Sequence, residues 1–126
     1  MSIFVKLPSG YFDIDHIREQ YEDLKDTSFE YGKWRPRAAL IEKNGKTSWL
    51  YTGQKYDPKF IDLVEDGWTH DHCVICSRSI SENENQYTDS TGYFNGYEWV
   101  CKGCYETVID TSDFEKRLAE LPKYEK

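Results

Sequence analysis

Cys73-Val74-Ile75-Cys76 and Cys101-Lys102-Gly103-Cys104 are two C-x-x-C pairs, and 24 residues separate them. This spacing is close to that of four-cysteine zinc sites. Two cysteines on one tight turn can bind the same ion, and a second pair completes a tetrahedron with Zn–S distances of about 2.3 Å. We therefore predict one structural Zn²⁺ ion, with the four ligands Cys73, Cys76, Cys101 and Cys104. Four thiolates leave no coordination position for water, which argues against a catalytic metal.

The segments around the two pairs predict the fold of the second half. The first pair would lie on a knuckle, and the polar stretch 83–96 favours an irregular loop or a short hairpin. Residues 97–100 alternate like a strand that runs into Cys101. The positive end of a helix dipole favours thiolates, so we expect Cys101 and Cys104 at a helix start. Knuckle, hairpin and helix in this order are typical of a treble-clef zinc finger.

Two other interpretations of the cysteines are less favoured. Four reduced cysteines could simply fill a core. Two C-x-x-C knuckles in an acidic, aromatic-rich chain also resemble an iron-binding rubredoxin, which would transfer electrons. Rubredoxins carry Gly directly after each pair, whereas Ser77 and Tyr105 stand there in this chain. Zinc is therefore the preferred metal.

The residues needed for an enzyme are missing from the sequence. His70 and His72 precede the first pair, but four cysteines already close a tetrahedron, so we expect these histidines at the surface or beside the ligands. A His-Asn-His nuclease needs histidines after the knuckle, and none follows residue 72. The motifs of a zinc deaminase, a nucleophile elbow and a phosphate-binding Gly-rich loop are also absent. The sequence predicts a protein that is not an enzyme.

The first half predicts a helix and a hairpin. Apolar residues recur at helical spacing between residues 14 and 26, after possible caps at Asp13 or Asp15. Asn44-Gly45 lies between two runs with strand character, 37–42 and 47–52, and is typical of a tight type I′ turn. A last helix is predicted to begin at the capping box Ser112-x-x-Glu115.

These elements together predict an α+β fold. An N-terminal helix and β-hairpin (residues 1–66) would pack on a C-terminal treble-clef-like Cys₄ zinc module (residues 67–126) and form one compact unit with it. Trp49, Trp68 and Trp99 are expected in or near the core, because leucine, isoleucine, valine and phenylalanine are scarce and aromatic side chains must replace them.

The charge of the chain indicates the kind of partner. The sequence has 16 Lys and Arg against 23 Asp and Glu, a formal net charge of −7. Such a surface suits a basic protein partner better than nucleic acid. Lys33, Arg35 and Arg37 surround Trp34 in a basic cluster that can contact phosphate, although a solvated turn with Trp34 in the core is the simpler interpretation. We find no signal peptide and no apolar run of membrane-spanning length, so we expect a cytoplasmic protein.

The stretch from Gly67 to Cys76, followed by Gly92-Tyr93 and by residues 99–105, resembles small bacterial proteins with a Trp-x-His-x-His-Cys-x-x-Cys zinc knuckle. The resemblance covers about residues 60–110. It implies a treble-clef or zinc-ribbon-like module with the four cysteines as ligands, and it implies no substrate.

The functional hypothesis from the sequence is a non-enzymatic, zinc-stabilised protein-binding protein. Its concrete form is an immunity or antitoxin-type inhibitor of a basic bacterial toxin. The alternative is a regulatory or nucleic-acid-associated zinc finger that uses Lys33, Arg35 and Arg37. We expect neither a membrane nor a small-molecule substrate as partner.

Overall fold

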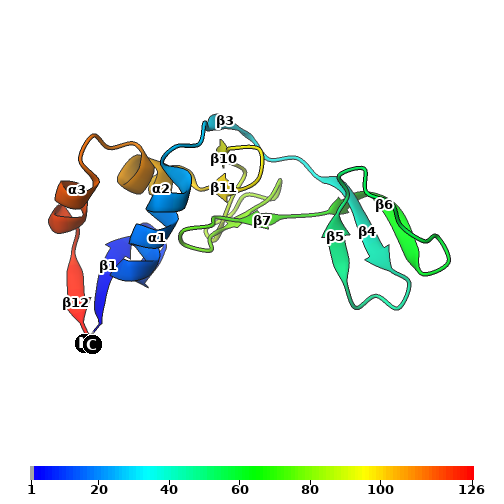
Figure 1. The fold of residues 1–126 in the computed structure, drawn as a ribbon, viewed down its shortest axis with the longest axis horizontal. Helices are drawn as coiled ribbons and strands as arrows, with labels where there is room; N and C mark the ends of the chain where they lie inside the picture. Colours follow the sequence, from blue (N-terminus) through cyan, green and yellow to red (C-terminus); the bar gives the residue numbers. More distant parts are fainter. Residues whose placement is uncertain (1) are drawn as a thin grey trace.

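The computed structural model describes residues 2–126, which form a mixed α+β structure with small, mostly antiparallel sheets (Figure 1). The chain has two visibly separate parts. The first, called the body here, comprises residues 2–34 and 71–126 and holds both ends of the chain and the four cysteines. The second, called the outer sheet, comprises residues 37–68 and projects from the body (Figure 1).

The two ends of the described chain meet in one sheet of the body. β1 (Ile3–Leu7) lies between β2 (Gly10–Asp13) and β12 (Lys123–Glu125), and both neighbours are antiparallel to it. Val5 and Leu7 of β1 are buried, because their side chains point to the same face of the sheet. None of these three strands was predicted from the sequence.

The helix predicted over residues 14–26 is confirmed as α1 (Ile14–Leu24). Asp13 caps it, because its carboxylate accepts a hydrogen bond of 2.8 Å from the Asp15 backbone N–H. Ile17 and Leu24 are buried on one face, seven residues apart, as helical periodicity requires.

Two further small sheets surround the cysteines. One has the order β11–β10–β3 and the other the order β7–β8–β9. Their strands are β3 (Glu30–Lys33), β7 (Asp71–His72), β8 (Ser79–Ile80), β9 (Thr88–Asp89), β10 (Thr91–Phe94) and β11 (Trp99–Val100).

The C-terminal helices begin at caps that differ in part from the prediction. Cys101 caps the short helix α2 (Lys102–Cys104), which continues as the π-helical turn η1 (Tyr105–Ile109). The predicted last helix exists as α3 (Phe114–Glu120), but Asp113 caps it and not Ser112. The Asp113 carboxylate is one residue closer to the helix, where it accepts a 3.1 Å hydrogen bond from the Lys116 N–H.

The outer sheet confirms the predicted hairpin and corrects its turn. β4 (Arg37–Glu42) pairs antiparallel with β5 (Ser48–Leu50) and with β6 (Ile61–Trp68). The Glu42 N–H donates to the Thr47 carbonyl, so four residues form the loop instead of a two-residue type I′ turn. Gly45 has φ +74°, whereas Asn44 keeps a negative φ.

The core lies in the body. Buried residues from β1, α1 and β11 pack together with the four cysteines, Trp34 and Trp99. Trp68 is half-buried against this cluster, but Trp49, which we expected near the core, is 42 % exposed on β5. The outer sheet projects from the body (Figure 1), and Trp49 does not reach the buried cluster there. Among residues 2–126, no helix is long and apolar enough to cross a membrane.

Candidate metal centre

The four cysteines predicted as ligands lie together in the body, where all four are buried. Their sulfur atoms lie within 4.8 Å of one another, and the Sγ atoms of Cys76 and Cys101 are 3.7 Å apart. Four thiolates at about 2.3 Å from one Zn²⁺ ion would have Sγ–Sγ distances of about 3.8 Å. A disulfide would need about 2.05 Å. The spacing therefore fits one tetrahedral metal ion and no disulfide.

The first pair lies on a tight turn between β7 and β8. The Ser77 N–H donates to the Cys73 carbonyl at 2.8 Å, and the Cys73 N–H donates to the Arg78 carbonyl at 2.8 Å. Ser77 has φ +65°, a conformation that glycine adopts without steric cost. The backbone thus takes the shape that glycine favours after such a pair, although the sequence has serine there.

The second pair opens a helix and does not form another knuckle. Cys101 directly follows the strand β11, and its Sγ accepts a 3.4 Å hydrogen bond from the Cys104 backbone N–H. The Tyr105 N–H donates to the Cys101 carbonyl at 2.9 Å, which closes the first turn. This confirms the prediction that Cys101 and Cys104 lie at a helix start.

The sulfurs are close enough to share protons. Hydrogen bonding with Cys101 and Cys104 lowers the pKa of the Cys76 thiol, whereas hydrogen bonding with Cys101 raises the pKa of the Cys104 thiol. A dication bound here would displace the remaining protons, because the metal ligand is the thiolate. Metal affinity at this cluster therefore increases with pH.

Two residues from the N-terminal part support the knuckle. The His16 Nε2–H of α1 donates to the Ile75 carbonyl at 2.8 Å, and the Ser9 hydroxyl donates to the Cys76 carbonyl at 3.5 Å. No sequence pattern points to the contact of His16 with Ile75, because 59 residues separate the two. These bonds join α1 and the β1–β2 hairpin to the metal centre.

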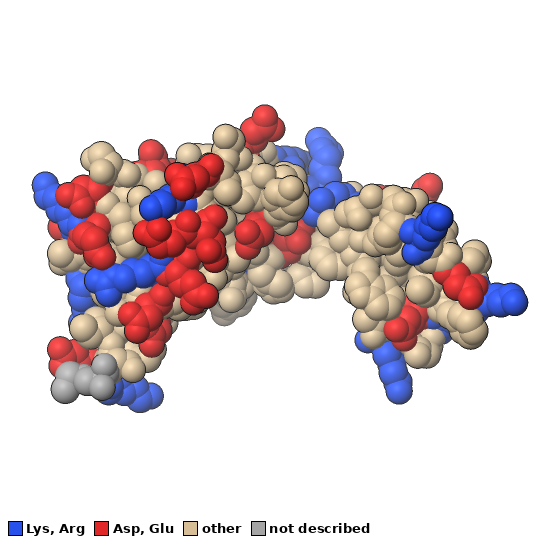
Figure 2. Space-filling view, in the orientation of Figure 1, with Lys and Arg blue, Asp and Glu red and all other residues tan. Residues whose placement is uncertain are grey.

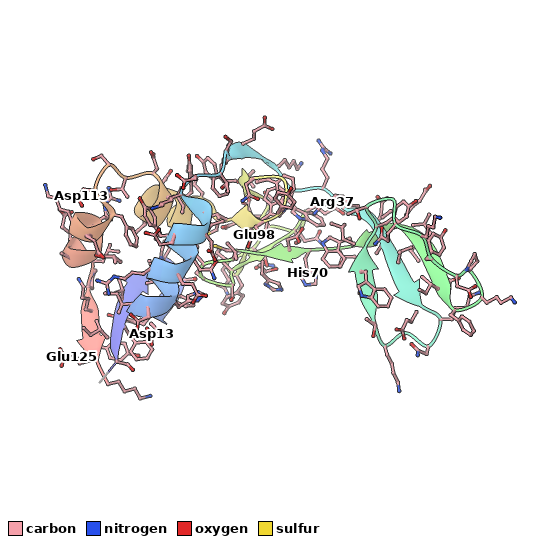
Figure 3. The ribbon with its side chains drawn as sticks, viewed as in Figure 1. Asp13, Arg37, His70, Glu98, Asp113 and Glu125 are labelled. Atoms are coloured by element: carbon pink, nitrogen blue, oxygen red, sulfur yellow. The ribbon has the colours of Figure 1, made fainter. Side chains whose placement is uncertain are left out.

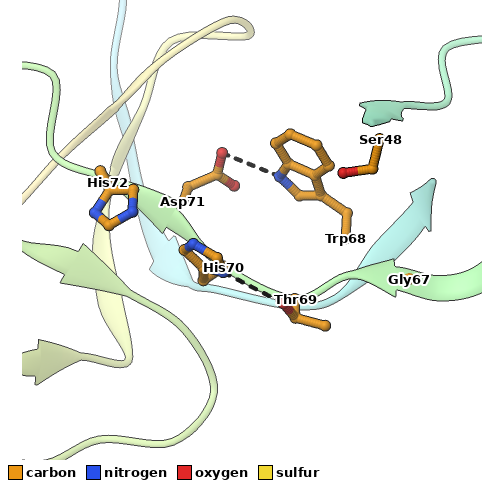
Figure 4. Close-up of a pocket in the computed structure, with 7 residues that line it drawn as sticks. All are labelled: Ser48, Gly67, Trp68, Thr69, His70, Asp71 and His72. Atoms are coloured by element: carbon orange, nitrogen blue, oxygen red, sulfur yellow. Dashed lines mark hydrogen bonds between the residues drawn. The ribbon is translucent and has the colours of Figure 1, made fainter. Parts of the chain in front are cut away.

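The other two histidines lie beside the centre and not in it. His70 and His72 are exposed, and their rings meet edge to face with centroids 5.0 Å apart. The His72 Nδ1–H donates to the Ser77 carbonyl at 3.1 Å, which supports the knuckle from outside. Both histidines line a shallow pocket of about 260 Å³ next to Trp68 (Figure 4).

Asp71, in the same pocket, connects the body with the outer sheet. Its carboxylate accepts hydrogen bonds from the indole N–H groups of Trp34, at 2.8 Å, and Trp68, at 3.1 Å. Arg37 adds an ion pair of 3.4 Å. Nothing in the sequence singled out Asp71, although two tryptophans near a carboxylate suit such an arrangement.

The basic cluster is split between the core and the surface. Trp34 is 1 % exposed, which agrees with the simpler interpretation of that stretch. Lys33, Arg35 and Arg37 instead line one surface groove.

Comparison of the chain with known protein families, with curated proteins and with solved structures found no match. The resemblance to knuckle-bearing bacterial proteins therefore finds support in the gathered cysteines alone. The geometry of the centre remains the basis for a function.

Proposed function

We propose that this protein is a zinc-stabilised, non-enzymatic protein-binding protein with a treble-clef-like Cys₄ module. The observation that carries the proposal is the set of four buried sulfurs at tetrahedral spacing. Zn²⁺ suits four thiolates and this geometry, and a filled Cys₄ set has no position for a substrate or an activated water. The knuckle, hairpin and helix around the set support the treble-clef assignment.

The surface above α1 supports a basic protein partner. Acidic side chains gather over this helix (Figure 2), where Asp15, Glu19, Glu22 and Asp23 are exposed. Two cations interrupt them: Arg18 pairs with Glu115 at 2.9 Å, and Lys25 pairs with Glu22 at 2.9 Å. The excess of negative charge attracts a positive surface and speeds association with it. The concrete form of the proposal is an immunity or antitoxin-type inhibitor of a basic bacterial toxin.

The test combines metal analysis with partner capture. Purified protein should contain one zinc ion per chain. A tagged chain should then capture a stoichiometric partner from its host that survives nuclease treatment, and the capture should weaken in Glu19→Lys/Asp23→Lys. The matched control is Asp57→Lys/Asp62→Lys in the outer sheet, which has the same change in charge. Capture that both variants reduce equally would contradict a role for the α1 surface, and a partner that disappears with nuclease would contradict direct protein binding.

A further inference from the structure

Exposed apolar side chains gather on the outer sheet. Among residues 2–126, the only large hydrophobic side chains that the body exposes are tyrosines, whose hydroxyl groups can bond to water. The other exposed side chains of this kind all lie in the outer sheet and are Trp49, Phe60, Leu63 and Val64. Apolar groups that cluster at a surface in this way are typical of an interaction site.

The register of the strands brings several apolar side chains to one face of the outer sheet. Leu40 of β4 lies opposite both Trp49 of β5 and Leu63 of β6, so the three form a row across that face. Tyr51 lies on the same face as Trp49, two residues further along the chain, and packs edge to face against Tyr56. Leu40 is buried, whereas Trp49 and Leu63 remain exposed at the two ends of the row. We call this side the apolar face.

The outer sheet lacks the second layer on which a sheet normally packs. In the described part of the chain, the main contacts of β4, β5 and β6 are with one another, and no helix lies over them (Figure 1). A sheet buries its apolar side against another layer of secondary structure. That layer can come from another chain.

The outer sheet also differs from the rest of the chain in charge. Residues 37–68 contain five Lys and Arg and five Asp and Glu, so the whole formal charge of −7 belongs to the rest of the chain. Uncharged atoms dominate the visible side of the outer sheet, whereas acidic side chains crowd the body (Figure 2). Two bodies therefore repel each other, while two outer sheets do not.

The charges of the outer sheet are divided between its two ends. Lys46 and Lys59 lie at the end far from the body, where the β4–β5 turn meets the start of β6. Glu65 and Asp66 lie at the other end, near Arg37 at the junction with the body (Figure 3). Lys46, Lys59, Glu65 and Asp66 are all exposed and form no ion pair among residues 2–126. A second copy in antiparallel orientation brings the cationic end of each sheet to the acidic end of the other.

We propose that the apolar face docks on the same face of a second copy of this chain, with the strands of the two sheets antiparallel. A twofold axis relates the copies, so each contact occurs twice. Trp49 and Leu63 anchor the interface, and Lys59 of each copy lies near Glu65 of the other. The two acidic bodies stand at opposite ends of the dimer. Because the sheet is small, we expect a dissociation constant of micromolar order. This inference goes beyond the proposed function and does not rest on it.

Sedimentation velocity on the zinc-loaded full chain tests the dimer at concentrations from about 1 to 200 µM. The mass should rise with concentration from 14.9 kDa toward twice that value. Trp49→Ser/Leu63→Ser should weaken association by about tenfold or more, because a few anchor side chains carry most of the energy of an interface. The matched control is Tyr87→Ser/Tyr97→Ser, which removes two exposed aromatic rings from the body.

A charge exchange tests the antiparallel orientation. Lys59→Glu should weaken the dimer, because the new carboxylate lies near Glu65 of the other copy. Lys59→Glu/Glu65→Lys exchanges the two signs and should restore association. The two positions are about 15 Å apart along β6, so they form no pair within one chain. Restoration therefore requires a second copy in this orientation.

The outcomes separate the dimer from other behaviour. Loss of association in the Trp49/Leu63 variant but not in the control, with restoration by the charge exchange, supports the proposal. A mass of 14.9 kDa at every concentration overturns it, as does equal weakening by the outer-sheet and body variants. Growth beyond a dimer overturns it as well, because open-ended addition would indicate pairing at strand edges. Failure of the charge exchange to restore association overturns the antiparallel arrangement. Far-UV circular dichroism of each variant confirms that the fold is retained.

Discussion

The body and the outer sheet are built in opposite ways. In the body, α1, the small sheets and the four cysteines contribute to one buried cluster. Among the described residues, that cluster contains no side chain from 37 to 67. The outer sheet buries Ala39 and Leu40 but leaves Trp49, Leu63 and Phe60 exposed. The difference indicates that the body is stabilised by its own core, which includes the four cysteines, and that the outer sheet depends on its attachment at Asp71.

Removal of one ligand should have the largest effect. Structural zinc contributes about 10–16 kcal/mol of apparent binding free energy in zinc-finger peptides, which matches the whole stability of a small domain, about 5–15 kcal/mol. Cys104→Ser should therefore lose zinc and unfold the body. Zinc content and near-UV circular dichroism measure both. His72→Ala is the control, since it should keep the metal, and a folded, zinc-free Cys104→Ser would contradict a structural ion.

Matched leucine truncations should reproduce the contrast between the two parts. Leu24 is 0 % exposed and Leu63 is 41 % exposed. Leu24→Ala should lower the free energy of unfolding by about 2–5 kcal/mol, because a cavity remains in the body. Leu63→Ala should change it by about 0.5 kcal/mol or less. Urea denaturation compares the two variants, and similar losses would mean that the outer sheet has a core of its own.

Removal of the Asp71 carboxylate should loosen the attachment of the outer sheet. Asp71→Ala leaves the indole N–H groups of Trp34 and Trp68 without their acceptor, which should cost about 2–4 kcal/mol. Hydrogen exchange should quicken at backbone amides of β4 and β6 more than at those of α1. Asp62→Ala removes an exposed carboxylate of the outer sheet and should have little effect. If hydrogen exchange in Asp71→Ala became faster to the same extent in β4, β6 and α1, the body and the outer sheet would unfold together.

The smallest effect is a gain in stability within the knuckle. Ser77→Gly should stabilise the protein by about 0.5–1 kcal/mol, because glycine adopts φ +65° without strain. Ser79→Gly in β8 is the matched control and should destabilise by a similar amount. Thermal unfolding of the zinc-loaded proteins measures both shifts, and shifts of the same sign would show that the Ser77 backbone carries no strain.

Local patterns in the sequence predicted the parts of the fold that depend on neighbouring residues. The C-x-x-C spacing predicted that the four cysteines lie together, and helical periodicity predicted the position of α1. Asn44-Gly45 indicated the hairpin but not its four-residue loop, because the turn type depends on how β4 and β5 align. Trp49 was placed wrongly, since an aromatic residue in a strand does not reveal which face another element covers.

Contacts between distant segments could not be predicted in this way. β1 pairs with β12 across almost the whole chain, with Phe4 opposite Tyr124. His16 reaches the knuckle and Asp71 reaches Trp34 through folding of the whole body. The residues of each pair are far apart in the chain, and no regular spacing in a single sequence connects them. They are nevertheless the contacts that position the metal centre and attach the outer sheet.

The pairing of Arg37 with Trp68 makes the outer sheet an insertion in the body. Its first and last residues are neighbours in register, so the chain leaves the body and returns to it at one place. A short turn could bridge that place, and the path of the body would continue without interruption. The length of the outer sheet can therefore change without altering the path of the chain around the four cysteines.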